Sequence, residues 1–201
     1  GVRVAVGHTD ADAATVLAAV DAGATSLTHL GNAMPPMLAR DPGPVGVTLG
    51  ARSDARLVAG VIVDGHHLHP DVVTAMWRAL GPSRFLTVSD TTAGLGLPDG
   101  RARLGDHEVV VSAGTVRLVD GTLAGSAAGL LDCLRLLHTT TGCSLEDAVA
   151  TVTTTPADLV GDPTRGRLEP GRRGDLTLVD DDLQPVATVV GGRVVHDARG
   201  S

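Results

Sequence analysis

The chain has 201 residues, 43% of them hydrophobic, and a formal net charge of −7 at neutral pH. This length allows one substantial core, and the negative balance argues against a nucleic-acid partner or a membrane surface, both of which favour basic patches. No apolar run approaches the length of a membrane span, and the N-terminus lacks the pattern of a signal peptide. The two cysteines, Cys133 and Cys143, have no metal-ligand spacing, so we expect them to be reduced and the protein to be cytoplasmic.

The first apolar segments predict a strand–helix–strand unit that brings two histidines to one edge of a sheet. Residues 2–6 and 24–28 are short apolar runs that end at His8 and His29. Residues 11–22 between them have a helical pattern, with Thr9 or Asp10 as the expected N-cap and Gly23 as the expected C-cap. Such a unit makes the two strands parallel neighbours. Both imidazoles are therefore expected at the carboxyl edge, where α/β folds place their chemistry. Because the chain opens directly on a strand, we expect a segment of something larger.

Two imidazoles at adjacent strand ends suggest a metal site, since neutral imidazole binds Zn²⁺ or Fe²⁺ well. The alternative is that each histidine caps its strand and hydrogen-bonds a loop. A loop rich in proline and glycine follows, and Arg40 is its strong cation. We interpret Arg40 as an anion clamp, with a solvated loop arginine as the alternative.

Residues 57–63 form the third predicted strand, and three histidines follow it closely. His69 precedes a proline and is expected to begin the next helix. Either His66 or His67 is then expected to face the same edge as the first two histidines.

Residues 84–88 form the fourth predicted strand, which ends at Asp90. A carboxylate at this edge is a candidate metal ligand or general base. The alternative is an Asx turn or a helix cap, but no clear helical pattern follows Asp90.

The remaining elements are expected to be mostly small strands and short helices. In chain order they are hairpins over residues 102–123, a loop of small residues over 123–129, helices over 130–140 and 144–155, and strands over 175–179, 186–190 and 193–196. Three short strands are marginal by themselves, so the last three are expected to belong to a small β-sandwich.

The order of strand-end residues resembles the amidohydrolase superfamily and, within it, the N-acetylglucosamine-6-phosphate deacetylases. The matching motifs are Gly7-His8-Thr9-Asp10-Ala11, Thr28-His29-Leu30-Gly31-Asn32-Ala33-Met34, Arg40-Asp41-Pro42-Gly43, Val63-Asp64-Gly65-His66-His67, Val88-Ser89-Asp90 and Gly121-Thr122-Leu123-Ala124-Gly125-Ser126. The resemblance implies an α/β fold: residues 1–165 as the C-terminal half of a metal-dependent (β/α)8 barrel, and residues 166–201 as strands of a small β-sandwich.

The resemblance also implies a role for each matching residue. It implies a divalent metal, zinc first and iron as the alternative, held by His8 and His29, with Asp90 as the catalytic aspartate. The residues implied to bind the phosphorylated amino sugar are Asn32, Ala33, Arg40, His67, Leu123, Ala124 and Gly125. Arg40 is implied to reach the neighbouring site of a homodimer. The implied reaction removes the acetyl group from N-acetylglucosamine 6-phosphate.

One departure keeps two alternatives open. The family's first metal ligand is a glutamate on an earlier barrel strand, and this sequence has no counterpart of it. The chain is therefore expected to need an N-terminal half, supplied elsewhere. The alternatives are an amidohydrolase that acts on a different amide, and a non-catalytic fragment or partner subunit.

Overall fold

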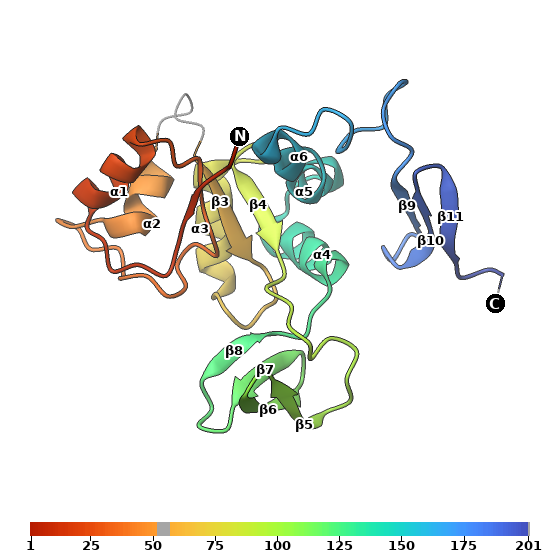
Figure 1. Ribbon diagram of the computed structural model, residues 1–201, viewed down its shortest axis with the longest axis horizontal. Helices are drawn as coiled ribbons and strands as arrows, with labels where there is room; N and C mark the ends of the chain where they lie inside the picture. The colour runs from red at the N-terminus through yellow and green to blue at the C-terminus, as the bar shows by residue number, and fades with distance from the viewer. Residues whose placement is uncertain (52–56, 201) are drawn as a thin grey trace.

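The computed structural model describes residues 1–51 and 57–200. Its central sheet has four parallel strands in the order β1-β2-β3-β4, and Figure 1 shows β3 and β4 side by side. Their bounds are Ala5–Val6 for β1, Ser26–Leu27 for β2, Val58–Ile62 for β3 and Phe85–Val88 for β4. The predicted α/β class, the four strands and their parallel pairing are confirmed, although each strand is shorter than the apolar run that predicted it. Strand β3 is buried along its whole length, as a strand covered on both faces must be.

Six helices lie in the described ranges. They are α1 Ala13–Asp21, α2 Gly43–Gly50, α3 Pro70–Leu80, α4 Leu130–Thr141, α5 Leu145–Val152 and α6 Thr154–Val160. None of these helices is both long enough and apolar enough to cross a membrane.

Helix α1 begins later than its sequence pattern predicts. The predicted N-cap was Thr9 or Asp10, but the side chain of Asp12 caps the helix by accepting a backbone N–H at 2.8 Å. The C-cap is Ala22 and not the predicted Gly23. A carboxylate caps an N-terminus wherever its backbone is extended, so neighbouring aspartates in this sequence could not be told apart.

Helix α2 lies where the sequence predicts only a loop. Pro44 belongs to its first turn, where a proline loses no hydrogen bond because the N–H would be unpaired anyway. The hydroxyl of Thr48 donates to the Pro44 carbonyl at 2.7 Å inside the protein. The prolines and glycines that indicated a loop are therefore also compatible with a helix start.

The predicted helix over residues 144–155 is two helices. The chain breaks at Thr153, whose φ of −127° and ψ of −73° lie outside the helical region, and α6 begins at once. Pro156, the residue directly after the predicted helix, lies in the first turn of α6, where its missing N–H is tolerated.

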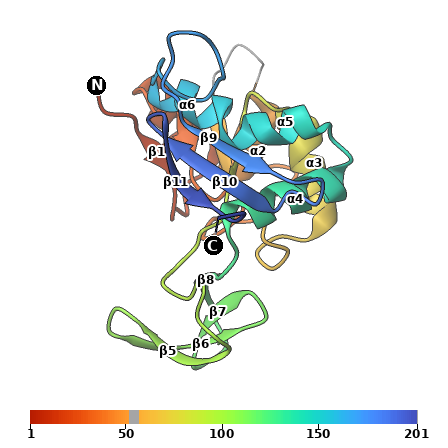
Figure 2. The same cartoon turned by 90° about the vertical axis from the view of Figure 1, so that its right-hand side faces the viewer.

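Two smaller antiparallel sheets complete the chain. One has the order β5-β6-β7-β8, and the other has the order β11-β10-β9. The strands are β5 Gly100–Leu104, β6 His107–Ser112, β7 Thr115–Leu118, β8 Leu123–Ser126, β9 Leu176–Val179, β10 Pro185–Val190 and β11 Arg193–Asp197. The hairpins are confirmed, but the first four residues of the predicted small-residue loop are strand β8. In both views the β5–β8 sheet projects from the rest of the molecule on the side of α4 (Figure 1 and Figure 2).

The main core lies between the central sheet and the helices that cover it. The chain has one tryptophan, one phenylalanine and no tyrosine, so its core must consist mainly of valine, leucine and alanine. Among the described residues, Phe85 is the one fully buried aromatic residue of this core, and its ring packs edge to face on that of Trp77 with centroids 5.6 Å apart. Cys133 and Cys143 are buried in this core and are not bonded to each other, as predicted. Burial, with the nearby Asp64 carboxylate, raises the pKa of the Cys133 thiol to about 12, so this thiol stays protonated.

Candidate active site at the carboxyl edge of the parallel sheet

The predicted site residues follow the carboxyl ends of neighbouring strands in the central sheet. His8 follows β1, His29 follows β2, His67 follows β3 and Asp90 follows β4. Neighbouring strands lie about 4.8 Å apart. All four side chains therefore belong to one edge of the sheet, as parallel pairing predicted.

Four predicted site residues share an unusual backbone conformation. His8, His29, Ala33 and Asp90 have φ values of 46°, 28°, 49° and 51°, and they make up four of the six described non-glycine residues with positive φ. This left-handed region costs about 1 kcal/mol or more for most side chains. Such outliers cluster at functional sites because surrounding contacts must hold them, which supports a functional role for this edge.

The first two histidines lie in contact. The rings of His8 and His29 meet edge to face, with centroids 4.6 Å apart and planes inclined by 73°. Two glycines permit this approach. A Cβ on Gly7 would lie 2.2 Å from the Thr28 methyl carbon, and one on Gly60 would lie 3.3 Å from the backbone nitrogen of His29.

The histidine pair fits part of a metal site. Nδ1 of His29 is buried and has no hydrogen-bond partner in the described structure, and a buried imidazole nitrogen without a partner is costly. Two imidazoles are suitable donors for zinc, but a catalytic zinc site uses three protein ligands. Residues 1–51 and 57–200 contain no cluster of three or more histidine, cysteine, aspartate or glutamate side chains arranged to hold a metal ion. Within the described ranges, the edge therefore has two imidazoles in contact but no third donor beside them.

His67 is held between two carboxylates. Its Nδ1 lies 2.7 Å from Oδ2 of Asp64, whose side chain is completely buried, and its Nε2 lies 3.6 Å from Oδ2 of Asp90. The other oxygen of Asp64 accepts the backbone N–H groups of His66 and His67 at 2.9 and 3.0 Å. Burial by itself raises the pKa of Asp64, but hydrogen bonds from the His67 ring and from both backbone groups outweigh it and hold that pKa well below its usual range.

These contacts distinguish the three neighbouring histidines. His67 faces Asp90. The Nε2 atom of His66 instead lies 3.4 Å from the position that a Cβ on Gly114 would take, in the turn between β6 and β7. His69 caps α3 and accepts the N–H of Asp71, as predicted. Asp64 was not among the site residues predicted from the sequence. Its signal was an aspartate directly after a buried strand and three residues before a histidine.

The loop after β2 joins the first two strand ends. The carbonyl of Ala33 accepts the N–H of Thr9 at 3.1 Å, and the side-chain nitrogen of Asn32 donates to the carbonyl of His29 at 3.2 Å. Arg40 is exposed further along this loop, before α2. Its assignment as an anion clamp stays a prediction.

Strand β8 is fixed to the segment that carries Asp90. The carbonyl of Asp90 accepts the N–H of Ser126 at 3.0 Å, and the carbonyl of Ser126 accepts the N–H of Thr92 at 3.0 Å. A Cβ on Gly125, whose φ is 130°, would lie 2.4 Å from the Thr92 methyl carbon. The structure therefore places the predicted Leu123-Ala124-Gly125 segment beside Asp90.

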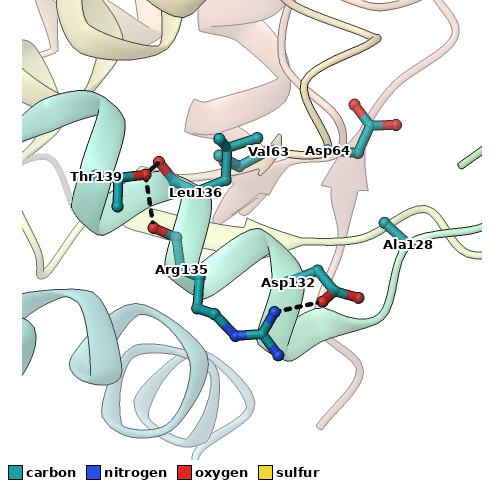
Figure 3. A pocket seen from close by; sticks show the side chains of 7 residues that line it. All are labelled: Val63, Asp64, Ala128, Asp132, Arg135, Leu136 and Thr139. Atoms are coloured by element: carbon teal, nitrogen blue, oxygen red, sulfur yellow. Dashed lines mark hydrogen bonds and ion pairs between the residues drawn. The ribbon is translucent and has the colours of Figure 1, made fainter. Parts of the chain in front are cut away.

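A separate cavity of about 280 Å³ lies between β3 and α4 (Figure 3). Asp132 and Arg135 form an ion pair of 2.7 Å at its wall, and the Asp64 carboxylate points away from the Arg135 guanidinium. The hydrogen-bond partner of the Asp64 side chain is therefore His67 and not Arg135.

Comparisons with known proteins agree with this geometry. Residues 1–195 match the family model described as the amidohydrolase family. The chain is 40% identical over 200 residues to the N-acetylglucosamine-6-phosphate deacetylase of Bos taurus, covering 97% of this chain and 48% of the relative. It is 34% identical over 198 residues to the N-acetylgalactosamine-6-phosphate deacetylase of Shewanella sp. (strain ANA-3), covering 98% of this chain and 50% of the relative.

A solved structure gives the same result. The crystal structure of N-acetylglucosamine-6-phosphate deacetylase from Thermotoga maritima superposes with a TM-score of 0.92 at 31% identity, covering 98% of this chain and 53% of that chain. The chain spans about half the length of the curated relatives that it matches.

Proposed function

The chain belongs to the amidohydrolase family, and we propose that it supplies the C-terminal half of an enzyme that deacetylates N-acetylglucosamine 6-phosphate. The products are glucosamine 6-phosphate and acetate. One observation carries the proposal: the His8–His29 pair and the His67–Asp90 pair lie at one edge of one parallel sheet. This edge offers both metal donors and a general base to an amide.

The proposed architecture follows from this assignment. Residues 1–165 form half of a (β/α)8 barrel, and residues 166–201 contribute strands to a small β-sandwich. Support comes from the open parallel sheet, whose edge strands β1 and β4 each pair with one other strand among the described residues. A closed barrel would pair both of these edges.

A divalent metal, zinc in our proposal and iron as the alternative, would be held by His8, by His29 and by a third ligand from outside the described residues. When bound, it would polarise the amide carbonyl and lower the pKa of an attacking water. The partnerless Nδ1 of His29 supports this role for the pair.

Asp90 acts on protons in the proposed reaction. It accepts a proton from the water that attacks the acetamide carbon, and it then gives that proton to the leaving nitrogen as the carbon–nitrogen bond breaks. The Asp90 side chain is 45% exposed and its backbone is fixed by Ser126. His67 contacts the sugar or the developing oxyanion beside it.

The sugar phosphate is bound by the loops around this edge in our proposal. The segments involved are Asn32-Ala33 after β2 and Leu123-Ala124-Gly125 in β8, and both are tied to strand ends by hydrogen bonds. Arg40 binds phosphate in the neighbouring site of a homodimer. We propose a cytoplasmic location. The proposed substrate carries a phosphate, and the two cysteines of the chain are buried and not bonded to each other, as is typical of that compartment.

The relative from Shewanella supports a second candidate substrate, N-acetylgalactosamine 6-phosphate. The two sugars differ in configuration at carbon 4, so the choice depends on hydroxyl contacts rather than on the reaction. A different amide substrate, or a non-catalytic role for this chain, remains the alternative that the following experiment decides.

The test joins this chain to the N-terminal half of the Thermotoga maritima deacetylase and measures acetate release from both sugar phosphates. We expect release from at least one of them, lowered about 10²–10⁴-fold by Asp90→Asn. Asparagine tolerates the left-handed backbone of residue 90, so circular dichroism should be unchanged. A folded, zinc-loaded chimaera that releases no more acetate than its Asp90→Asn variant would contradict the proposal.

A further inference from the structure

We infer that Asp64 is a positioning residue that fixes His67 in the tautomer with its proton on Nδ1 and so presents the bare Nε2 atom to Asp90 and the substrate. The inference rests on the proposed function only for the use of this orientation in catalysis. The tautomer itself follows from hydrogen-bond geometry.

The two oxygens of the Asp64 carboxylate accept hydrogen bonds from different groups. Oδ1 accepts two backbone N–H groups, from His66 and His67, and Oδ2 lies 2.7 Å from the ring nitrogen Nδ1 of His67. An ionised carboxylate can only accept hydrogen bonds. The 2.7 Å contact therefore requires the proton of the neutral ring to be on Nδ1.

The second ring nitrogen is then free to accept. Nε2 of His67 lies 3.6 Å from Oδ2 of Asp90, which is longer than a direct hydrogen bond. This spacing leaves room for a substrate hydroxyl to donate to Nε2, or for Asp90 to donate once it has taken a proton. A ring with its proton on Nε2 could accept from neither group.

Asp64→Asn provides a sharp test because an amide has one acceptor and one donor end. The two backbone N–H groups of His66 and His67 require the amide oxygen. The NH₂ group must then face Nδ1, which can receive it only as an acceptor. We therefore expect the substitution to move the ring proton from Nδ1 to Nε2.

The experiment reads the tautomer by long-range proton–nitrogen correlation NMR on the ¹⁵N-labelled chain at alkaline pH. The nitrogen that carries the proton is distinguished from the bare one by its chemical shift, and His67→Gln identifies the signals. We expect an Nδ1 proton in the unsubstituted chain and an Nε2 proton in Asp64→Asn. Asp132→Asn is the matched control, because Asp132 lines the same cavity and pairs with Arg135, and it should leave the tautomer unchanged.

Two results would overturn the inference: an Nε2 proton in the unsubstituted chain, or an Nδ1 proton that persists in folded Asp64→Asn. If that variant does not fold, the exchange rate of the Nδ1 proton with water decides. A proton shared with a buried carboxylate exchanges slowly, whereas one exchanging as fast as the ring proton of exposed His107 would refute the inference. None of these readings needs enzymatic activity, so an inactive chimaera would sink the proposed function and leave this inference to its own test.

Discussion

At the scale of single residues, several residues of the candidate site have a backbone conformation that is unfavourable for side chains other than glycine. His8, His29 and Asp90 all have positive φ. Their neighbours hold them in place: Leu30 donates its N–H to the Gly60 carbonyl at 2.7 Å, and Ser126 donates to Asp90. Local strain of this kind persists only where the rest of the fold over-determines it.

Gly7→Ala is expected to damage the histidine pair through sterics. The added carbon would lie 2.2 Å from the methyl carbon of Thr28, and overpacking of this kind costs about 1–3 kcal/mol. We expect urea denaturation to show that loss. The control is Gly50→Ala, in α2, where a Cβ meets no atom of residues 1–51 or 57–200 within 4 Å and alanine should stabilise by about 0.4–1 kcal/mol. Equal effects of the two substitutions would refute the steric account of Gly7.

At the scale of elements, a buried hydroxyl pair joins β4, the strand that leads to Asp90, to α5. Thr87 and Thr151 have oxygens 2.7 Å apart, and Thr151 donates to the Ala148 carbonyl at 2.7 Å. Since a hydroxyl has one proton, Thr87 must donate to Thr151. The two threonines are therefore not equivalent.

This order predicts unequal costs for two similar substitutions. Thr151→Val leaves the Thr87 hydroxyl buried without an acceptor and should cost about 1–3 kcal/mol. Thr87→Val leaves Thr151 its bond to Ala148 and should cost less. The double variant should be more stable than Thr151→Val alone, measured by denaturation. Additive losses would show that the hydroxyls do not depend on each other.

Some of these helices and strands could be predicted from the sequence, and others could not. The four strands, α3 and α4 followed from apolar runs and proline or glycine boundaries, and the edge residues followed from where the runs end. Helix α2 was missed because Pro42 and Pro44 indicate a loop and a helix start equally well. The break at Thr153 depends on distant partners: the Thr154 hydroxyl donates to Gly166 and that of Thr155 to Pro82.

Asp64, the partner of His67, was not predicted from the sequence. Three nearby histidines gave no rule for which one faces the site, because that depends on the turn formed around Asp64. A carboxylate three residues before a histidine, directly after a buried strand, is a usable signal for such a pair. The roles of Arg40 and the substrate loops stay predictions.

At the scale of the whole molecule, we expect the folded chain by itself to form part of a metal site. The parallel sheet places His8 and His29 in contact. Strand β8, which belongs to the β5–β8 sheet, is hydrogen-bonded to the segment that carries Asp90 at the same edge. The rest of a catalytic site, including a third ligand, would come from beyond the described residues.

Titration of the purified chain with zinc, monitored by isothermal calorimetry, tests this claim most directly. We predict saturation at about one Zn²⁺ per chain, with weaker binding than a complete three-ligand site. His29→Gln should abolish the binding, and His107→Gln, in the small sheet, should leave it intact. Absence of zinc binding by the folded chain, or binding that survives His29→Gln, would contradict the account.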